Sequence, residues 1–366
     1  MRIFAISMEQ VNQYVKQFPQ LMKGKKVLYV HGFGSSGQSG TVARLRQVLP
    51  GAEVIAPDLP VHPQEAMDLL NNVCREAHPD LIIGTSMGGM YAEMLRGYDR
   101  ILVNPALEMG ETMKAHGMTG TQHFQNPRQD GVQEFIVTKA LVKEYKEMTE
   151  HCFEGADTAE EQQHVVGLFG DEDTTVNTYD LFRTHYRTAI RFHGEHRMND
   201  RSFMHAVVPV IRWIADRQEQ RQRPIIYIDV NALIDQRQLQ IAAEGAQATA
   251  PATTAQPLGS LSTKVPPASS AQKTLRTLLE SYQLYFVAPA TDDPSAYAAM
   301  LSWLYEYVNV PAYGHTVFTN QKELLYGDYL IDPEKTEGMA TLIQFGTDTF
   351  KTWDDVAQYF ERLGGQ

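Results

Sequence analysis

One short stretch, Gly84-Thr85-Ser86-Met87-Gly88, constrains the fold of this chain more than any other. It follows an apolar run at residues 81–83 and precedes a helical pattern at 89–95. A strand, a G-x-S-x-G turn and a helix, in that order, form the sequence context of a nucleophile elbow. The glycines allow a tight turn, and the Met87 amide at the start of the helix can stabilise an oxyanion. The same pattern also fits an ordinary glycine-rich turn, so the rest of the chain has to decide between the two.

The segments on either side of this turn alternate between strand and helix patterns. Short apolar runs indicate buried strands, and amphipathic patterns indicate helices between them. The strand patterns lie at 26–30, 53–56, 100–103, 164–169 and 188–192, and the helical patterns at 39–49, 63–77 and 203–217. Strands alternating with helices at this spacing predict a parallel sheet with helices on both faces. We therefore expect an α/β domain over residues 1–218.

The alternation pauses at residues 108–163, where we find one good helical pattern, at 135–152. Hydrolases with a nucleophile elbow often carry a lid at this place, after the strand that follows the elbow. A helix that merely packs on the edge of the sheet fits the pattern equally well. The sequence leaves both interpretations open.

A chain of 366 residues is too long for one average domain, so two domains are expected. Residues 219–366 form a second, smaller α/β pattern. Its strand patterns lie at 225–229, 284–287, 316–319 and 328–331, and its helices at 295–308 and 353–363. Residues 242–272 are dominated by Ala, Thr, Pro, Ser and Gln. Such a low-complexity segment cannot bury enough apolar surface to fold by itself.

A serine hydroxyl is a weak nucleophile near neutral pH, so it needs an imidazole base and an acid that orients the imidazole. In proteins with a nucleophile elbow these residues follow in the order Ser, Asp or Glu, His. Ser86, Asp173 and His196 obey that order, and each lies at the end of a predicted strand. Asp171 and His193 compete for the acid and base roles. The spacings Gly-x-x-Asp and Gly-x-His favour Asp173 and His196.

The turn after the first predicted strand reads His31-Gly32-Phe33-Gly34. A loop at this place supplies the second amide of an oxyanion hole, so we expect the Phe33 amide to act together with that of Met87. We expect His31 to support this loop and not to transfer protons.

Six motifs now occur in order, H-G-F-G-S-S-G, A-P-D-L-P, G-T-S-M-G-G, V-N-P-A-L, G-D-E-D and G-E-H. Together they resemble the small bacterial YqiA-like esterase family of the α/β-hydrolase fold, over residues 26–217. The resemblance implies a carboxylic ester hydrolase that cleaves short acyl esters through an acyl-enzyme on Ser86. The insertion at 108–163 and the residues before 26 depart from the family pattern.

A second resemblance covers residues 224–363. The segments D-V-N-A-L-I-D, N-Q-K-E-L-L and G-D-Y-L-I-D are similar to motifs of the 5′(3′)-deoxyribonucleotidase family, which has the haloacid-dehalogenase-like fold. The resemblance implies a phosphatase-like pocket formed by Asp229, Asn231, Lys322, Asp328 and Asp332.

This second resemblance has four departures from the family pattern. Asn231 replaces the aspartate that acts as general acid, and an amide cannot donate and recover a proton. Val287 stands where a phosphate-binding Ser or Thr is expected, with Thr291 as a nearby substitute. Pro333 stands where a further acid would help to hold Mg²⁺, and residues 242–272 replace the cap. We therefore expect a domain that kept the fold and lost the chemistry, and the departures weigh against Mg²⁺ binding.

The net charge of −12 disfavours nucleic acid and anionic membranes as partners, because both require a basic surface. Neither a signal peptide nor a run long enough to span a membrane is present, so we expect a cytoplasmic protein. The expected partner is a small acyl ester, and its hydrolysis requires no metal or cofactor. Two alternatives remain: a bifunctional esterase and nucleotidase, and a non-catalytic protein that binds partners through both domains.

Overall fold

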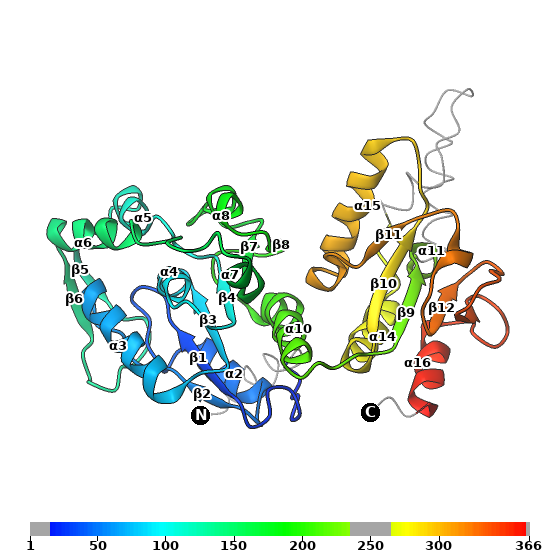
Figure 1. The fold of residues 1–366 in the computed structure, drawn as a ribbon, viewed down its shortest axis with the longest axis horizontal. Coiled ribbons are helices and arrows are strands. Elements are labelled where there is room, and N and C mark those ends of the chain that lie inside the picture. Colours follow the sequence, from blue (N-terminus) through cyan, green and yellow to red (C-terminus); the bar gives the residue numbers. More distant parts are fainter. Residues whose placement is uncertain (1–14, 235–264, 364–366) are drawn as a thin grey trace, which may run out of the picture. The chain divides into compact units, whose positions relative to one another are not determined.

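The computed structural model describes residues 15–234 and 265–363. They belong to two compact units, and the boundary between the units lies between Glu219 and Gln220 (Figure 1). No helix among the described residues combines the length and the apolar character needed to cross a membrane.

The first unit is built on a six-stranded sheet whose order is β2-β1-β3-β4-β7-β8. Every neighbouring pair is parallel, which confirms the expected α/β architecture. The strands are β1 (Lys26–Val30), β2 (Glu53–Ile55), β3 (Leu81–Thr85), β4 (Arg100–Val103), β7 (Val165–Gly170) and β8 (Ala189–Phe192). Because the sheet is parallel, the carboxyl ends of these strands meet at one edge.

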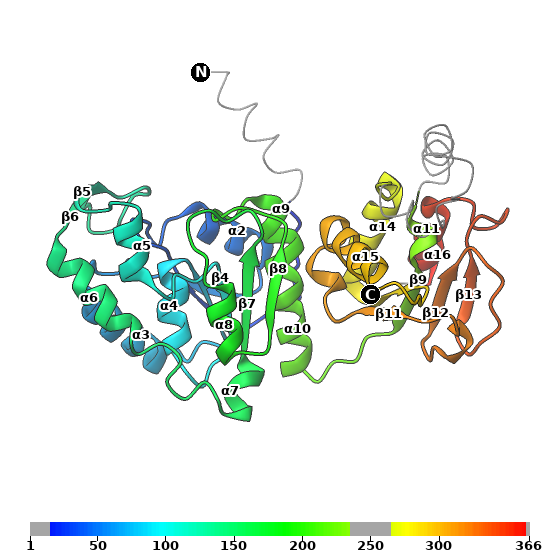
Figure 2. The ribbon, with the colours of Figure 1, turned by 90° about the horizontal axis from the view of Figure 1, so that it is seen from above.

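Helices cover both faces of this sheet (Figure 2). They are α2 (Gly40–Val48), α3 (Pro63–Ala77), α4 (Met87–Met94), α8 (Tyr179–His185), α9 (Asp200–Ser202) and α10 (Val208–Gln218). Leu28 packs in one core cluster with residues of α3 and α4, whereas the neighbouring Tyr29 faces the side chains of α2. Alternate residues of a strand therefore face opposite layers of helices.

The single helix expected at 203–217 is instead divided into two pieces, and a short helical turn precedes them. The α9 turn leads into a π-helical turn at Phe203–Val207, and α10 follows. Pro209 is the second residue of α10 and has no N–H to donate to the preceding turn. We attribute the wider π-helical turn to this missing hydrogen bond.

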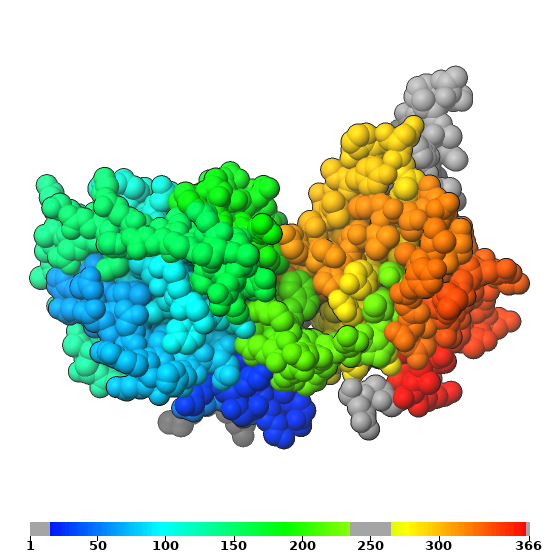
Figure 3. Space-filling view, viewed as in Figure 1, coloured from blue at the N-terminus to red at the C-terminus, as the bar shows by residue number. Residues whose placement is uncertain are grey.

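The segment at 108–163 contains more structure than its sequence predicted. Its elements are α5 (Met109–Ala115), β5 (Gly120–His123), β6 (Glu134–Val137), α6 (Lys139–Thr149) and α7 (Ala159–His164). The helix expected at 135–152 begins only at Lys139, because Thr138 caps it by accepting a hydrogen bond from the Leu141 amide. The residues before Thr138 pair with β5 in an antiparallel hairpin. Helix α6 packs against α5 and α3, and these helices are visible at the surface in Figure 3.

The second unit contains a five-stranded parallel sheet of order β11-β10-β9-β12-β13. Its strands are β9 (Ile225–Asp229), β10 (Gln283–Ala288), β11 (Thr316–Phe318), β12 (Tyr329–Asp332) and β13 (Thr341–Gln344). Its helices are α11 (Val230–Leu233), α14 (Ser269–Ser281), α15 (Pro294–Tyr307) and α16 (Trp353–Arg362), with 3₁₀ turns at Val310–Ala312 and Lys322–Leu324. The sequence did not predict β13.

Most of the low-complexity segment, residues 242–264, lies outside the described residues. The remainder corrects the expectation for this segment, because α14 already begins at Ser269 and Ala271 is buried. Val265 is also buried, and its carbonyl oxygen accepts a hydrogen bond from Trp303 Nε1 at 2.8 Å. Ala271 lies on the same helical face as Leu275 and Leu278. Because the first residues of α14 are small, the sequence pattern did not show where this apolar face of the helix begins.

Candidate active site

Ser86 lies in a strained turn between β3 and α4. Its backbone adopts φ 56° and ψ −121°, a region that residues other than glycine rarely occupy and that costs about 1–3 kcal/mol. A Cβ on Gly84 would lie 2.3 Å from the Gly88 carbonyl oxygen, and one on Gly88 would lie 2.0 Å from the Val30 carbonyl oxygen. Both flanking positions therefore require glycine. The turn has the geometry of a nucleophile elbow.

Two hydrogen bonds connect Ser86 to the other two predicted residues. His196 Nε2 lies 3.0 Å from Ser86 Oγ, and His196 Nδ1 lies 2.7 Å from Asp173 Oδ2. A carboxylate can only accept, so His196 donates from Nδ1 and its Nε2 is left to accept the proton of Ser86. The structure thus brings together Ser86, His196 and Asp173, with the side chain of Asp173 almost fully buried. In this arrangement the imidazole can remove the hydroxyl proton.

Asp173 is held in place by the turn that follows β7. Its Oδ1 accepts hydrogen bonds from the amides of Thr175 at 2.7 Å and Val176 at 2.9 Å. Burial raises the pKa of Asp173, but the hydrogen bonds from His196 and from these amides outweigh it, so its pKa lies below the ordinary value. Asp173 therefore stays ionised near neutral pH and can stabilise a protonated imidazole.

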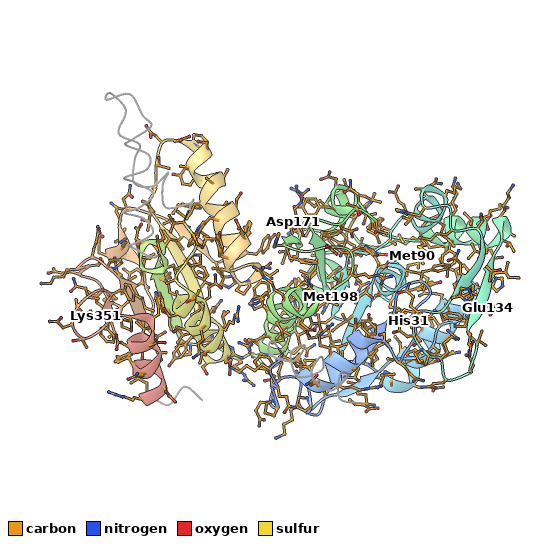
Figure 4. All side chains as sticks on the ribbon, turned by 180° about the vertical axis from the view of Figure 1, so that it is seen from behind. His31, Met90, Glu134, Asp171, Met198 and Lys351 are labelled. Carbon is orange, nitrogen blue, oxygen red and sulfur yellow. The ribbon has the colours of Figure 1, made fainter. Side chains whose placement is uncertain are left out.

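The competing residues Asp171 and His193 pair with each other and not with Ser86. Asp171 lies 3.4 Å from His193 Nδ1, and its Oδ1 accepts a hydrogen bond from the Gly194 amide at 3.0 Å. This pair is exposed or partly exposed, and Figure 4 shows Asp171 on the ribbon of the first unit. It joins the turn after β7 to the loop after β8. It can orient those loops without contacting the serine.

His31 anchors the loop that follows β1. Its Nδ1 donates to the Gly32 carbonyl oxygen at 2.9 Å, and its Nε2 accepts from the Leu59 amide at 3.0 Å. The side chain is 2% exposed, and burial lowers its pKa below the ordinary value. Both ring nitrogens of this neutral imidazole are occupied, so His31 holds the loop and takes no part in proton transfer with Ser86.

The two residues expected to supply oxyanion amides are Phe33, in the loop after β1, and Met87, which directly follows Ser86. Gly32, which precedes Phe33, approaches so closely that a Cβ would lie 3.3 Å from the Cβ of Ser86. Met87 is the first residue of α4, where N–H groups have no acceptor within the helix. Its side chain is buried, and its sulfur accepts a hydrogen bond from the Tyr145 hydroxyl at 3.2 Å. The loop after β1 and the start of α4 thus both lie next to Ser86.

Asn104 is the residue that the sequence reasoning missed. It follows β4 with φ 45°, is 2% exposed, and accepts a hydrogen bond from the Gly170 amide at 2.7 Å. Its Nδ2 lies 3.1 Å from the carbonyl oxygens of both Glu195 and His196. One buried side chain therefore fixes the turn after β7 and the loop that carries His196. The motif V-N-P-A-L contained the only sequence signal for it.

Ser86 opens into a cavity of about 1090 Å³. The segment at 108–163 forms one wall of it, with Met109, Met118 and Phe135 in the lining. This wall is joined to the loop after β1, because the Gln125 amide donates to the Gly34 carbonyl oxygen at 2.7 Å. The insertion therefore lines one side of this cavity and is tied to the loop that carries Phe33.

A second cluster of charged residues lies at the carboxyl edge of the second sheet. Lys322 Nζ is 2.6 Å from Asp229 Oδ2 and 2.9 Å from Asp332 Oδ2. Burial raises the pKa of Asp229 despite this contact. Burial lowers the pKa of Lys322, but the two aspartates outweigh it and hold the pKa above its ordinary value. The cluster also includes Asn231, whose backbone N–H donates to Asp229 Oδ1 at 2.8 Å.

The expected pocket residue Asp328 does not belong to this cluster. Asp328 directly precedes β12, whereas Asp332 is the last residue of this strand. The Cα atoms of the two aspartates are therefore separated by roughly 13 Å along the strand. Asp328 instead accepts a hydrogen bond from the Ile225 amide at 2.8 Å, at the opposite edge of the sheet. The two aspartates of the motif G-D-Y-L-I-D thus have different roles.

The donors around the remaining cluster fit Mg²⁺ poorly. All four carboxylate oxygens of Asp229 and Asp332 accept hydrogen bonds or pair with Lys322. Thr336 Oγ1 donates to Asp332 as well, at 2.8 Å. A hard divalent cation requires several free oxygens, and the ammonium group already occupies the space between the two acids. Lys322 thus supplies the positive charge of this cluster.

Residues 26–211 match the model of the Uncharacterised protein family (UPF0227), and this match spans more than half of the 366 residues. The chain belongs to UPF0227. This confirms the resemblance to the YqiA-like esterases. The bounds of the UPF0227 match include Ser86, Asp173 and His196. Residues 108–163 lie within the bounds of this match.

Proteins that carry the name 5'(3')-deoxyribonucleotidase also match part of this UPF0227 chain. The "Putative 5'(3')-deoxyribonucleotidase" of Vibrio phage KVP40 is 28% identical over 170 residues, which cover 43% of this chain and 95% of that protein. The 5'(3')-deoxyribonucleotidase of Bacillus subtilis strain 168 is 32% identical over 76 residues, and the chain spans 44% of its length. Among solved structures, the ferulic acid complex of Est1E from Butyrivibrio proteoclasticus is 14% identical with a TM-score of 0.38, covering 55% of this chain and 91% of that one.

Proposed function

We propose that the first unit is a serine esterase that hydrolyses short acyl esters through an acyl-enzyme intermediate. The observation that carries this proposal is the pair of hydrogen bonds that joins Ser86 to His196 at 3.0 Å and His196 to Asp173 at 2.7 Å. Membership of UPF0227 and the strained backbone at Ser86 support it.

The proposed reaction has two halves. His196 Nε2 removes the proton of Ser86 while Oγ attacks the ester carbonyl carbon, and the imidazolium then gives that proton to the departing alcohol oxygen. A water molecule, deprotonated by the same nitrogen, attacks the acyl-enzyme and releases the carboxylic acid together with free Ser86. In both halves the amides of Phe33 and Met87 stabilise the negative oxygen. These steps require no cofactor or metal.

Asp173 contributes to both halves by its charge. Its lowered pKa keeps it ionised when His196 becomes protonated. Its contact with Nδ1 holds the imidazole in the tautomer that leaves Nε2 free. The proposed partner is a small acyl ester in the cytoplasm, and not a nucleic acid or a membrane.

We propose that the second unit is a haloacid-dehalogenase-like domain without phosphatase activity. Asn231 offers no general acid, and Val287, buried near the end of β10, offers no hydroxyl to a phosphate group. Lys322, Asp229 and Asp332 remain as a satisfied charge cluster.

A bifunctional enzyme is the second candidate. The observation that favours it is the same cluster, because an aspartate at the end of β9 faces a lysine and a second aspartate, and because relatives carry the name deoxyribonucleotidase. A protein that only binds partners is the third candidate.

One labelling experiment separates catalysis from partner binding. A fluorophosphonate probe is expected to form a covalent adduct on Ser86 in the wild-type chain and none in Ser86→Ala. His193→Ala serves as the matched control and should label at the wild-type rate. If the wild-type chain remains unlabelled, the esterase proposal fails. Release of phosphate from nucleoside monophosphates separates the first two candidates.

A further inference from the structure

We propose that Tyr145, on helix α6 of the segment at 108–163, is the positioning residue of the oxyanion hole. Its side chain contacts those of both Phe33 and Met87, the two residues whose amides are assigned to the negative oxygen. The inference rests on the proposed esterase function and deepens it. It gives the segment at 108–163 a part in the reaction: this segment holds the two oxyanion residues in register with each other.

The contact with Met87 reaches the start of α4. The Tyr145 side chain is fully buried, and its hydroxyl lies 3.2 Å from Met87 Sδ. Met87 directly follows Ser86 and is the first residue of α4. Its side chain is also buried, so water does not compete for this contact. Because interiors are close-packed, a fixed Met87 side chain restrains the helical turn that carries the Met87 N–H.

The hydroxyl of Tyr145 is itself held from two further directions. It lies 3.0 Å from the Val61 carbonyl oxygen, in the loop after β2, and shares its one proton between this oxygen and Met87 Sδ. Its oxygen accepts a hydrogen bond from the Tyr91 hydroxyl of α4 at 3.4 Å. Burial raises the pKa of Tyr145, so the hydroxyl keeps its proton and remains a donor. Tyr145 is therefore a fixed point against which α4 is placed.

The ring of Tyr145 contacts the second oxyanion residue. It meets the ring of Phe33 edge to face, with centroids 6.0 Å apart and an interplanar angle of 84°. Phe135 of β6 meets the same ring at 5.2 Å and 82°. The Gln125 amide donates to the Gly34 carbonyl oxygen at 2.7 Å, one residue after Phe33. All these contacts come from the segment at 108–163, so this segment fixes the loop after β1.

Tyr145 thus connects two residues that lie 54 positions apart in the chain, Phe33 and Met87. Helix α6, which carries it, packs against α3 and α5 (Figure 2). Oxyanion donors act only at hydrogen-bond distance from the charged oxygen, and misplacing such a group by about 1 Å costs roughly 100-fold in rate. The relative position of the β1 loop and the α4 start therefore decides the rate, and Tyr145 sets it.

The first experiment is Tyr145→Phe, which removes the hydroxyl and keeps the ring that contacts Phe33. On p-nitrophenyl butyrate we expect kcat to fall about 10–100-fold with little change in KM, because the oxyanion forms only after substrate has bound. The pH dependence of kcat/KM, which reports the His196 base, should keep its midpoint. An unchanged kcat would overturn the proposal. A shifted midpoint would assign the loss to the triad and would overturn it as well.

A probe that forms the oxyanion without a leaving group isolates this effect. A short alkyl trifluoromethyl ketone accepts Ser86 Oγ at its carbonyl carbon, the hydroxyl proton passes to His196, and the carbonyl oxygen becomes the oxyanion. Its inhibition constant should rise by the same factor by which kcat falls in Tyr145→Phe. N-propyl butanamide, a competitor that binds without reacting, should bind the wild-type and variant proteins equally. Equal loss for both inhibitors would indicate a damaged cavity and would overturn the positioning role.

Two further variants assign the effect to the contact with Met87. Met87→Leu removes the sulfur and keeps an apolar side chain, so it should lower kcat in the same way. The double variant should be no slower than Tyr145→Phe alone, because residues that act through one contact are not additive. Full additivity would contradict the proposed route through Met87. If Tyr145→Phe does not fold, Met87→Leu takes its place in both assays, and a wild-type kcat in Met87→Leu would then overturn the proposal.

Glu144→Ala is the matched control on α6. Its exposed carboxylate contacts His62 Nδ1 at 2.8 Å, so its removal also takes one contact away from α6. Its kcat should equal that of the wild-type chain, and a loss as large as that of Tyr145→Phe would overturn the specific role of Tyr145. Wild-type hydrolysis together with full activity of Tyr145→Phe would remove this inference and leave the proposed function intact. A wild-type chain that neither hydrolyses the ester nor reacts with fluorophosphonate would remove both.

Discussion

Gly88, the second residue of α4, lies against β1 so closely that a Cβ on it would stand 2.0 Å from the carbonyl oxygen of Val30. The same atom would lie 2.6 Å from the carbonyl oxygen of His31. Both neighbours are backbone atoms of a central strand and the loop after it, so neither can move aside cheaply. The contact explains why the elbow needs a glycine after its serine.

We therefore expect Gly88→Ala to destabilise the first unit by more than about 3 kcal/mol, the upper end of ordinary overpacking. Thermal or denaturant unfolding measures this loss. Gly40→Ala is the matched control, because a Cβ there meets nothing within 4 Å and the residue is the first of a helix. Equal stability of the wild-type and Gly88→Ala proteins would show that α4 can shift away from β1.

Ser86→Ala should abolish the hydrolysis of short p-nitrophenyl esters while the protein stays folded. Removal of a triad nucleophile typically lowers turnover on the order of a millionfold. His196→Ala should behave alike, whereas His193→Ala should retain activity because His193 pairs with Asp171. Steady-state kinetics on purified variants test this. The reverse pattern for the two histidines would mean that the base is misassigned.

Asn104→Asp should lower kcat/KM roughly 100-fold, the usual effect of misplacing a reacting group by about 1 Å. Aspartate tolerates the positive φ of this position and can still accept from the Gly170 amide, but it cannot donate to the carbonyl oxygens of Glu195 and His196. The loop that carries His196 therefore loses its anchor. The measurement is the rate of fluorophosphonate labelling of Ser86 alongside the steady-state kinetics, and unchanged rates would remove the positioning role of Asn104.

Lowering the pH below about 6.5 should reduce the stability of the first unit through His31. Burial lowers the pKa of His31 below its ordinary value of 6.5. Between pH 6.5 and this lowered pKa, the unfolded chain binds a proton that the folded chain does not. The free energy of unfolding therefore decreases as the pH is lowered through this range. One such group contributes a slope of at most about 1.4 kcal/mol per pH unit.

The measurement is the free energy of unfolding at pH 7.5, 6.5 and 5.5 in the wild-type chain and in His31→Gln. The variant should be less stable at neutral pH and should show a flatter dependence on pH. His315 shifts in the same direction through its own burial, but it is present in both proteins and cancels in the comparison. Identical slopes would mean that His31 does not titrate in this window.

The proximity of Ser86, Asp173 and His196 could be predicted from the sequence, because each of them follows a predicted strand. In a parallel sheet all carboxyl ends share one edge, so knowing the strands was enough without knowing their order in space. The role of Asn104 could not be predicted in the same way. Its hydrogen bonds reach residues 66 to 92 positions away, and nothing in the pattern around residue 104 indicates those partners.

Two errors in the sequence interpretation have local causes. Residues 135–152 alternate apolar and polar side chains in a way that fits a helix, but Thr138 caps that helix and the residues before it pair with β5. Asp328 and Asp332 belong to one motif, but they stand at the two ends of a short strand. A motif fixes the order of side chains along the chain and does not fix the edge of the sheet at which each one lies.

The second unit should release no phosphate from nucleoside monophosphates above background, with or without magnesium. Asn231 leaves the departing alkoxide without a proton donor, and general acid catalysis is typically worth about 10²–10⁴-fold. Val287 offers no hydrogen bond to the phosphate group. Lys322 lies between Asp229 and Asp332, so the two carboxylates already have a counter-charge where a metal would be needed.

Because these deficits act on different parts of the reaction, restoring one residue should do little, and Asn231→Asp should not rescue turnover. The assay uses the full chain with Ser86→Ala, which removes any contribution from the first unit, and Asp229→Asn on the same background is its control. Phosphate release that disappears in the Asp229→Asn protein would overturn this prediction and make the protein bifunctional.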